Sequence, residues 1–271
     1  MVDHLDRFTE ICSEQTPRLD SGLAVIACAF HASATEAQLI QNLDDLASQI
    51  AREHRVSFGT DISDGSPNEF CRALFGVAGF QGDRAQYSNP ANSLLDQILE
   101  RRLGLPITLS ILGIELGRRC GINFVGIGMP SHFLIRQSNN GDEFYDPFSG
   151  GVALSLGQVQ LLFQSLQGPQ QRFDQAYVAP TEHHLILLRV LNNLQAAYTR
   201  LADRQRLTMT LRLKTAMPQC QPETFMQLAV VLGSIGDFLH AAEIHDRLCV
   251  TDPRNVAAHE RAAREFRARL N

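Results

Sequence analysis

Hydrophobic residues recur at helical spacing along most of this sequence and change to short strand-like runs only near its middle. Leu39, Leu43, Leu46 and Ile50 fall on one face of a helix, which predicts a helix over residues 35–55. The same reasoning predicts further helices over 3–14, 22–32, 67–75, 92–102, 107–119 and 155–166, and through the chain from 181 onward. The pattern therefore indicates a mainly helical protein.

Three runs in the middle are rich in β-branched and aromatic residues and are separated by Gly, Pro and Asn. They cover residues 123–128, 132–137 and 143–146. The turn at 138–142 contains Asn-Gly, a pair that strongly favours a tight hairpin. We therefore expect the runs 132–137 and 143–146 to pair antiparallel, which gives an α+β fold with helices packed on a small antiparallel sheet.

Capping residues suggest where several helices begin and end. Ser21 is a candidate N-cap for the second helix, and Asn92 or Ser93 for the helix that reaches residue 102. Gly104 is expected to end that helix. Pro106 suits the first turn of the next one, because a helix needs no N–H from its first residues.

The C-terminal part contains an internal repeat of the tetratricopeptide (TPR) type. Its signature positions are Phe225, Leu228, Leu232, Gly236, Ala241, Leu248 and Pro253. A shift of about 34 residues, the TPR period, places Asp237 on Asp203. We interpret this as two degenerate repeats followed by a last helix over 256–270. The predicted domains are residues 1–178 and an all-α TPR-like segment over 181–271, which would have to pack against the first because a single repeat cannot bury its own apolar face.

Composition narrows the functional classes. The chain has 271 residues, is 44% hydrophobic and carries a net charge of −5, which argues against a nucleic-acid-binding surface. It contains no apolar run long enough for a transmembrane helix, and its N-terminus lacks the apolar region of a signal peptide. The six cysteines are widely scattered, as expected for reduced thiols. We therefore expect a cytoplasmic protein with no membrane partner.

His132 and Asp146 are the candidate catalytic pair. They lie at corresponding ends of the two runs joined by the Asn-Gly turn. A carboxylate beside the imidazole would fix its tautomer and support its protonated form, as an acyl-transfer triad requires. A structural pair that braces the hairpin would have the same spacing, so both readings stay open.

Several motifs around this pair resemble the SirB-type transglutaminase-like proteins. The core of the resemblance is PITLSILGIELGRRCGI, followed by HFLIR and DPFSGG. It extends upstream through GFQGDRAQYSNPANSLLDQILERR and downstream through LRVLNNLQAAY, and covers roughly residues 20–260. The resemblance implies a transglutaminase/papain-like core, with a nucleophile-bearing helix packed on an antiparallel sheet, followed by TPR-like helices.

The resemblance also assigns roles to particular residues. Active transglutaminase-like enzymes use Cys, His and Asp, and His132 and Asp146 match the last two. The Cys position, at the start of the helix, falls on Pro106, give or take one residue; the SirB-type motif itself has Gly-x-Pro-Ile there. The residue before the histidine is Ser131, where the family pattern leads us to expect Gly.

Three residues are candidate substitutes for the missing cysteine. Thr108 and Ser110 lie about one turn along the same helix, and Cys71 lies on an apolar helix face that also suits a core position. Cys120 is excluded because it lies about 21 Å along the helix from Pro106. The favoured function is a non-catalytic protein- or peptide-binding module, regulatory in role, that binds through the cleft or the TPR-like helices. The alternative is an acyl-transfer enzyme, of peptidase, amidase or transglutaminase type, with a displaced nucleophile.

No cofactor or metal site is predicted. The Gly126-x-Gly128 pair lacks a third glycine and a following helix, both of which a dinucleotide fingerprint requires. His183 and His184 are adjacent, and a second histidine pair is five residues apart. Neither spacing places two ligands on one helix face. The sequence gives no indication of the partner's identity or of the oligomeric state.

Overall fold

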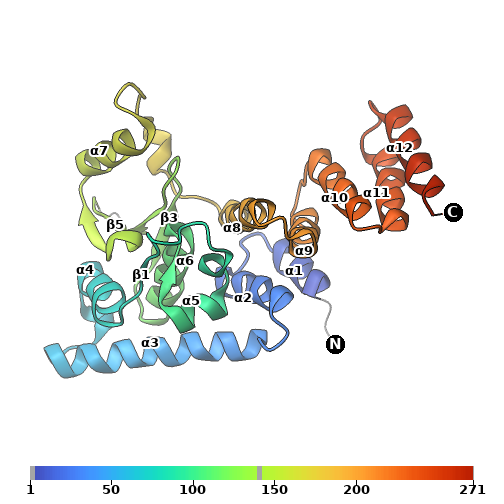
Figure 1. The fold of residues 1–271 in the computed structure, drawn as a ribbon. Coiled ribbons are helices and arrows are strands. Elements are labelled where there is room, and N and C mark those ends of the chain that lie inside the picture. Colours follow the sequence, from blue (N-terminus) through green and yellow to red (C-terminus); the bar gives the residue numbers. More distant parts are fainter. Residues whose placement is uncertain (1–3, 139–141, 271) are drawn as a thin grey trace. The chain divides into compact units, whose positions relative to one another are not determined.

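A computed structural model describes residues 4–138 and 142–270 (Figure 1). The chain forms two compact units: Thr16–Val190, and a second that combines the N-terminus up to Gln15 with Leu191–Asn271. The division falls inside helix α8 (His183–Arg200). The domain boundary predicted between residues 178 and 181 stays a prediction.

The unit Thr16–Val190 is built on a four-stranded antiparallel sheet. Its strands are β3 (Phe124–Ile127), β4 (Leu134–Gln137), β5 (Phe144–Asp146) and β6 (Val152–Leu154), paired in that order. The predicted hairpin is present, with Ile135 opposite Tyr145. These strands and the surrounding helices confirm the α+β class. The predicted Asn-Gly turn falls on residues 139–141, outside the described residues.

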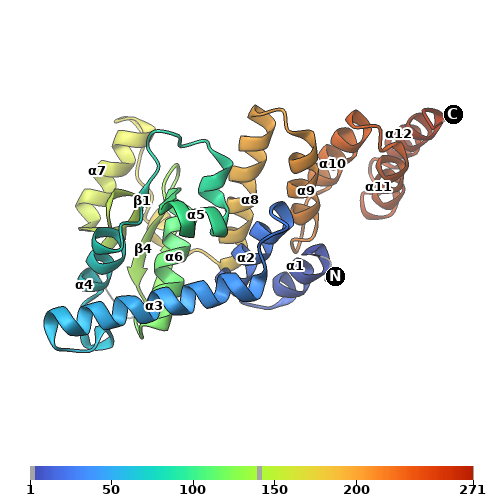
Figure 2. The same cartoon turned by 60° about the horizontal axis from the view of Figure 1, so that its bottom comes forward.

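Helix α6 (Pro106–Arg119) is the centre of this unit. It packs on β3 and β4, and helices α2 (Leu19–Phe30) and α3 (Glu36–Phe58) also pack against it, as Figures 1 and 2 show. Every residue of α6 from Pro106 to Gly117 is buried. Gly117 permits the close approach to the sheet, because a Cβ there would lie 2.7 Å from the Phe124 ring. The position of the helix start is therefore fixed by packing along its length.

Successive side chains of each strand point to opposite faces of the sheet, and both faces are covered by helices. Leu134 and Phe144 join a cluster with Val159 and Phe163 of α7 (Leu156–Gln167). Their neighbour Ile135 points to the α6 side, where it lies against Gly113. The remaining elements of the unit are η1 (Ile62–Asp64), α4 (Pro67–Cys71), the π-helix η2 (Arg72–Val77), β1 (Gln81–Gly82), η3 (Pro90–Ser93), α5 (Leu95–Arg101), β2 (Leu103–Gly104), η4 (Pro147–Ser149) and η5 (Gln175–Val178).

The predicted ends of two helices were wrong. Helix α2 begins before Ser21, whose backbone N–H donates to the Asp20 carboxylate at 2.8 Å. Helix α5 begins after Leu94, and neither Asn92 nor Ser93 caps it. It ends at Arg101, and its C-cap residue Arg102 adopts a left-handed φ of 55°. Gly104, expected to end the helix, lies in strand β2, and the parallel pair β1–β2 was not predicted.

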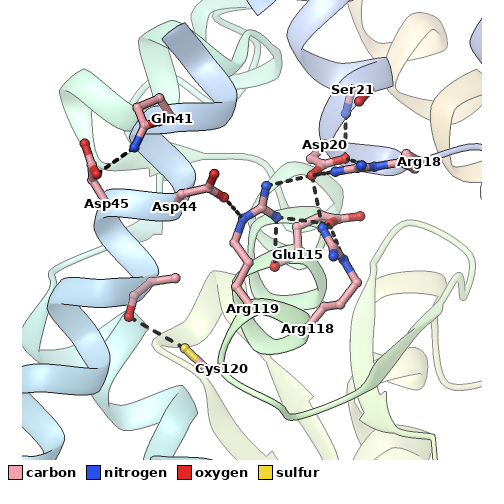
Figure 3. A network of polar contacts seen from close by, with 11 residues as sticks. Arg18, Asp20, Ser21, Gln41, Asp44, Asp45, Glu115, Arg118, Arg119 and Cys120 are labelled. Atoms are coloured by element: carbon pink, nitrogen blue, oxygen red, sulfur yellow. Dashed lines mark hydrogen bonds and ion pairs between the residues drawn. The ribbon is translucent and has the colours of Figure 1, made fainter. Parts of the chain in front are cut away.

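An ion-pair network joins α2, α3 and α6 (Figure 3). We call it the Asp20 network, and it comprises Arg18, Asp20, Asp44, Glu115, Arg118 and Arg119. The Asp20 side chain is fully buried and contacts three arginines, the shortest contact being 2.7 Å to Arg119. Burial raises the pKa of Asp20, but hydrogen bonds from Arg18 and Arg119 outweigh it and hold the pKa at about 2. With three arginines and three carboxylates, the network is charge-balanced.

The second unit is entirely helical in its described part. It contains α1 (His4–Ser13), the end of α8, α9 (Arg204–Thr215), α10 (Pro222–Ser234), α11 (Phe238–Thr251) and α12 (Val256–Ala268). Leu211, Leu228, Leu232 and Leu248 form its core. The helical character of the C-terminal segment is confirmed, and its assignment to TPR repeats stays a prediction. Among the described residues, no helix is both long and apolar enough to cross a bilayer.

Candidate functional site

Helix α6 begins in a tightly bonded loop. Pro106 occupies the first helical position, where its missing N–H is not needed. The Thr108 hydroxyl accepts the N–H of Leu105 at 2.9 Å and donates to the Asn92 carbonyl at 2.7 Å. The sequence singled out Thr108 as a candidate nucleophile; in the structure its hydroxyl joins the helix start to the preceding loop.

The preceding loop is fastened by a second set of buried polar groups. The Asn92 side chain donates to the Gln86 carbonyl at 2.8 Å and accepts from Arg101 at 2.9 Å. Arg101 also contacts Asp83 at 3.0 Å. Asn89 makes a turn instead, by accepting the N–H of Ala91. The motif residues of this loop therefore hold it against the start of α6.

His132 and Asp146 are in contact, with His132 Nε2 lying 3.0 Å from Asp146 Oδ1. Both are buried, at 7% and 3% exposed, and Nε2 makes no hydrogen bond that meets the usual geometry. His132 lies two residues before β4 rather than within a strand, and Asp146 ends β5. Ser110 of α6 approaches the carbonyl of Phe133 at 3.5 Å, so the first turns of α6 run beside this pair.

Asp146 has a structural task as well. Its Oδ1 accepts the backbone N–H groups of Phe148 and Ser149, at 3.0 and 3.3 Å, and so caps η4. Burial raises the pKa of Asp146, but contact with His132 and Ser149 outweighs burial and leaves the pKa below its usual range. A carboxylate beside Nε2 favours the His132 tautomer that carries its proton on Nε2.

Ser131 occupies a position that suits glycine. Its φ is 62°, in the left-handed region that side chains disfavour. The Gln167 amide donates to the Ser131 hydroxyl at 2.7 Å, which holds this turn. The left-handed backbone at this position explains why the resemblance leads us to expect Gly here.

Arginine and aromatic side chains surround the pair, and the sequence analysis did not single them out. The Phe148 ring lies edge-on to His132 at 6.1 Å and to Tyr87 at 5.8 Å, and the Arg84 guanidinium lies 4.9 Å above it. Arg189 donates to the carbonyl of His132 at 2.9 Å. We call His132, Asp146, Phe148, Arg84, Tyr87 and Arg189 the His132 site. Arg84 and Tyr87 belong to the upstream motif run, the one signal that could have pointed to them.

With this geometry established, the family can be assigned. The sequence profile of the transglutaminase-like superfamily matches residues 37–192, more than half of the chain. The chain belongs to the transglutaminase-like superfamily. This confirms the family that the motifs predicted, and the matched range contains every residue of the His132 site.

Curated relatives of this transglutaminase-like chain fall into two groups. A UPF0162 protein of Xylella fastidiosa (strain Temecula1) is 32% identical over 190 residues, which cover 64% of this chain and 66% of that protein. A UPF0162 protein of Pseudomonas aeruginosa is 29% identical over 191 residues, covering 69% and 67%. Human F-box only protein 21 is 30% identical over 98 residues, covering 33% and 16%. The chain spans about half to two thirds of the length of the first relatives, and no solved structure matches it significantly.

The three candidate nucleophiles Thr108, Ser110 and Cys71 are all buried. Thr108 and Ser110 are fully buried, and the Thr108 hydroxyl is bonded to backbone groups. Cys71 is also fully buried, and burial raises the pKa of its thiol far above the usual range. Cys120 lies at the opposite end of α6 from Pro106.

Sequence spacing compares histidines only within one helix, whereas the structure brings together histidines from two different helices. His245 of α11 and His259 of α12 face each other with their Nδ1 atoms 3.2 Å apart. Asp252 lies 3.2 Å from His259 Nε2. Within the described ranges, no group of three or more side chains is arranged to hold a metal ion.

Proposed function

We propose that this chain is a transglutaminase-like protein without a nucleophile, and that its His132 site binds a protein or peptide in a regulatory role. The observation that carries the proposal is the combination of a buried His132–Asp146 contact with a helix that starts at Pro106. In this proposal His132 is the base and Asp146 its orienting carboxylate, and a proline at the helix start supplies no attacking atom.

The states of the other candidate nucleophiles support this reading. A nucleophile must be in contact with its base and able to reach substrate. The Thr108 hydroxyl is committed to backbone partners, and Ser110 is shielded from solvent. A thiol such as Cys71, with a strongly raised pKa, supplies little thiolate near neutral pH.

A partner has two surfaces to use. The His132 site offers the Tyr87 ring, which is 48% exposed and suits peptide contact, as exposed aromatic side chains often do. In the second unit, a mainly apolar groove of about 490 Å³ is lined by Leu207, Leu211, Met226 and Val230, among others. The first surface is the one tied to the family's chemistry.

The proposal is tested by selecting a random-peptide display library on the immobilised protein. We expect enriched peptides to bind wild type with micromolar affinity and to bind His132→Ala at least tenfold more weakly. Thermal melts of each variant separate loss of contact from loss of fold. Equal binding to both proteins would place the binding surface elsewhere. A destabilised Asp146→Asn variant with unchanged peptide binding would favour the structural, hairpin-bracing role of the pair.

The alternative function is acyl transfer with a displaced nucleophile, and the His132–Asp146 contact is the observation in its favour. Incubation with a panel of electrophilic acyl probes, followed by peptide mapping, distinguishes the two functions. We expect no adduct on Thr108, Ser110 or Cys71. Peptidase, amidase or transglutaminase turnover that His132→Ala abolishes would refute the non-catalytic proposal.

A further inference from the structure

The His132 site carries more positive than negative charge. Arg84 and Arg189 both lie in it, and among the residues that the structure describes neither has a carboxylate at ion-pair distance. Asp146 is the one carboxylate of the site, and it faces His132. The neighbouring Asp83 is already paired with Arg101. Two guanidinium groups against one carboxylate leave one excess positive charge.

Arg84 is held in place but keeps most of its donors. Its guanidinium lies over the Phe148 ring, and its Nη2 donates to the Ser149 hydroxyl at 3.1 Å. A guanidinium has five N–H donors in a planar fork that matches a carboxylate. The ring contact fixes the direction of the fork, so less entropy is lost when an anion binds.

Arg189 contributes a further positive charge to the His132 site, and Tyr87 contributes a hydrogen-bond donor. Arg189 donates to the carbonyls of Met129 and His132, which carry no formal charge, so its own charge is uncompensated. Burial lowers the pKa of Arg189, and the nearby Tyr87 opposes this. The Tyr87 ring contacts Phe148 beside Arg84, and an exposed phenol can supply a further O–H donor.

We propose that Arg84 and Tyr87, supported by the charge of Arg189, form a carboxylate-binding subsite beside His132 that takes a carboxylate of a peptide ligand. This inference rests on the proposed function, since it names the chemistry of the ligand at the same site. A bound carboxylate would neutralise the excess charge and could accept a bidentate pair of hydrogen bonds from Arg84. The carboxylate comes either from the C-terminus of the peptide or from a Glu or Asp side chain.

The test uses three short probes and the His132 ring signals in NMR, assigned by comparison with His132→Ala. The probes are acetyl-Ala-Ala-Ala as free acid, the same peptide as amide, and acetyl-Ala-Glu-Ala amide. We expect at least one carboxylate probe to shift the ring signals with a Kd at least tenfold lower than that of the neutral amide. The stronger of the two carboxylate probes identifies the source.

Arg84→Gln should weaken the carboxylate probe at least fivefold and leave the neutral peptide unchanged. Arg52→Gln is the matched control, because Arg52 is exposed and lies on α3, outside the His132 site. The Arg52→Gln variant should bind every probe with the affinity of wild type. Arg84→Lys should restore part of the loss, since an ammonium keeps the charge without the fork.

Other outcomes overturn the inference in distinguishable ways. If acid and amide probes bind equally and both are lost in His132→Ala, the subsite is refuted while the peptide-binding proposal stands. Inorganic phosphate shifting the ring as strongly as the peptides would reduce the site to a general anion site. If no probe moves the His132 signals, the subsite is refuted, and the random-peptide selection still decides the proposed function independently.

Discussion

Two clusters of charged side chains lie in the same unit, and they differ in how completely their charges are compensated. In the Asp20 network every arginine contacts a carboxylate, and Asp20 itself contacts three arginines. In the His132 site, Arg84 and Arg189 contact carbonyl and hydroxyl oxygens instead. A network in which every charge is paired needs no ligand, because the fold alone brings the partners together. An uncompensated one leaves charge available for a ligand.

The largest effect is expected from Asp20→Ala, which removes the shared carboxylate of the Asp20 network. It leaves Arg119, whose side chain is 9% exposed, without its central partner. Breaking a buried pair costs about 3–5 kcal/mol when the remaining charge is left without a partner, and the loss here should approach the lower end of that range because Arg119 keeps Asp44 and Glu115. Urea unfolding should show this loss. Asp44→Ala is the control, since Asp44 is 51% exposed and should cost less than about 1 kcal/mol. Equal costs for both would mean that the network is not organised by Asp20.

Acid should weaken the Asp20 network over a defined range. The pKa of Asp20 is about 2 in the fold, below the ordinary value of 3.8, so the unfolded chain binds the proton first. Stability from this group is therefore present above about pH 4 and is lost as the pH falls toward 2, by about 2 kcal/mol. Unfolding free energies measured between pH 5 and pH 2 should fall less steeply in Asp20→Asn. An unchanged slope would contradict this assignment.

Pro106→Cys tests whether the start of α6 lies beside His132. If the helix start lies within reach of His132, the new thiol should have a pKa at least one unit below an ordinary cysteine, equivalent to about 1.4 kcal/mol. The pH dependence of iodoacetamide alkylation measures this, with wild type reporting the background of native cysteines. Adding His132→Ala should return the pKa toward its usual value. If the second substitution has no effect, Pro106 does not stand at the nucleophile position.

Sequence patterns predicted the elements of the fold well because their signals are local. The face of α3, the strands around the hairpin and the proline at the start of α6 were all readable from neighbouring residues. The His132–Asp146 contact was also readable, because one short hairpin joins the two residues.

What the sequence did not show depends on groups that are distant along the chain. Asn92 was expected to cap a helix, but its side chain instead fastens the loop before α6 through Gln86 and Arg101. Strand β2 forms only because β1, about twenty residues earlier, lies beside it. Arg84 and Tyr87 gather around Phe148, and Arg189 donates to the His132 carbonyl. These residues come from three segments of the chain, and no spacing rule anticipates their meeting.

If α6 begins at the nucleophile position, as we propose, Pro106 lacks more than an attacking atom. In acyl-transfer sites the backbone N–H of the nucleophilic residue often helps to form the oxyanion hole, which stabilises the charge of the tetrahedral intermediate. Pro106 has no N–H to offer there. A hydroxyl or thiol supplied from a neighbouring turn would therefore face a tetrahedral intermediate with one stabilising donor missing, and a single residue thus withholds two separate contributions to the rate.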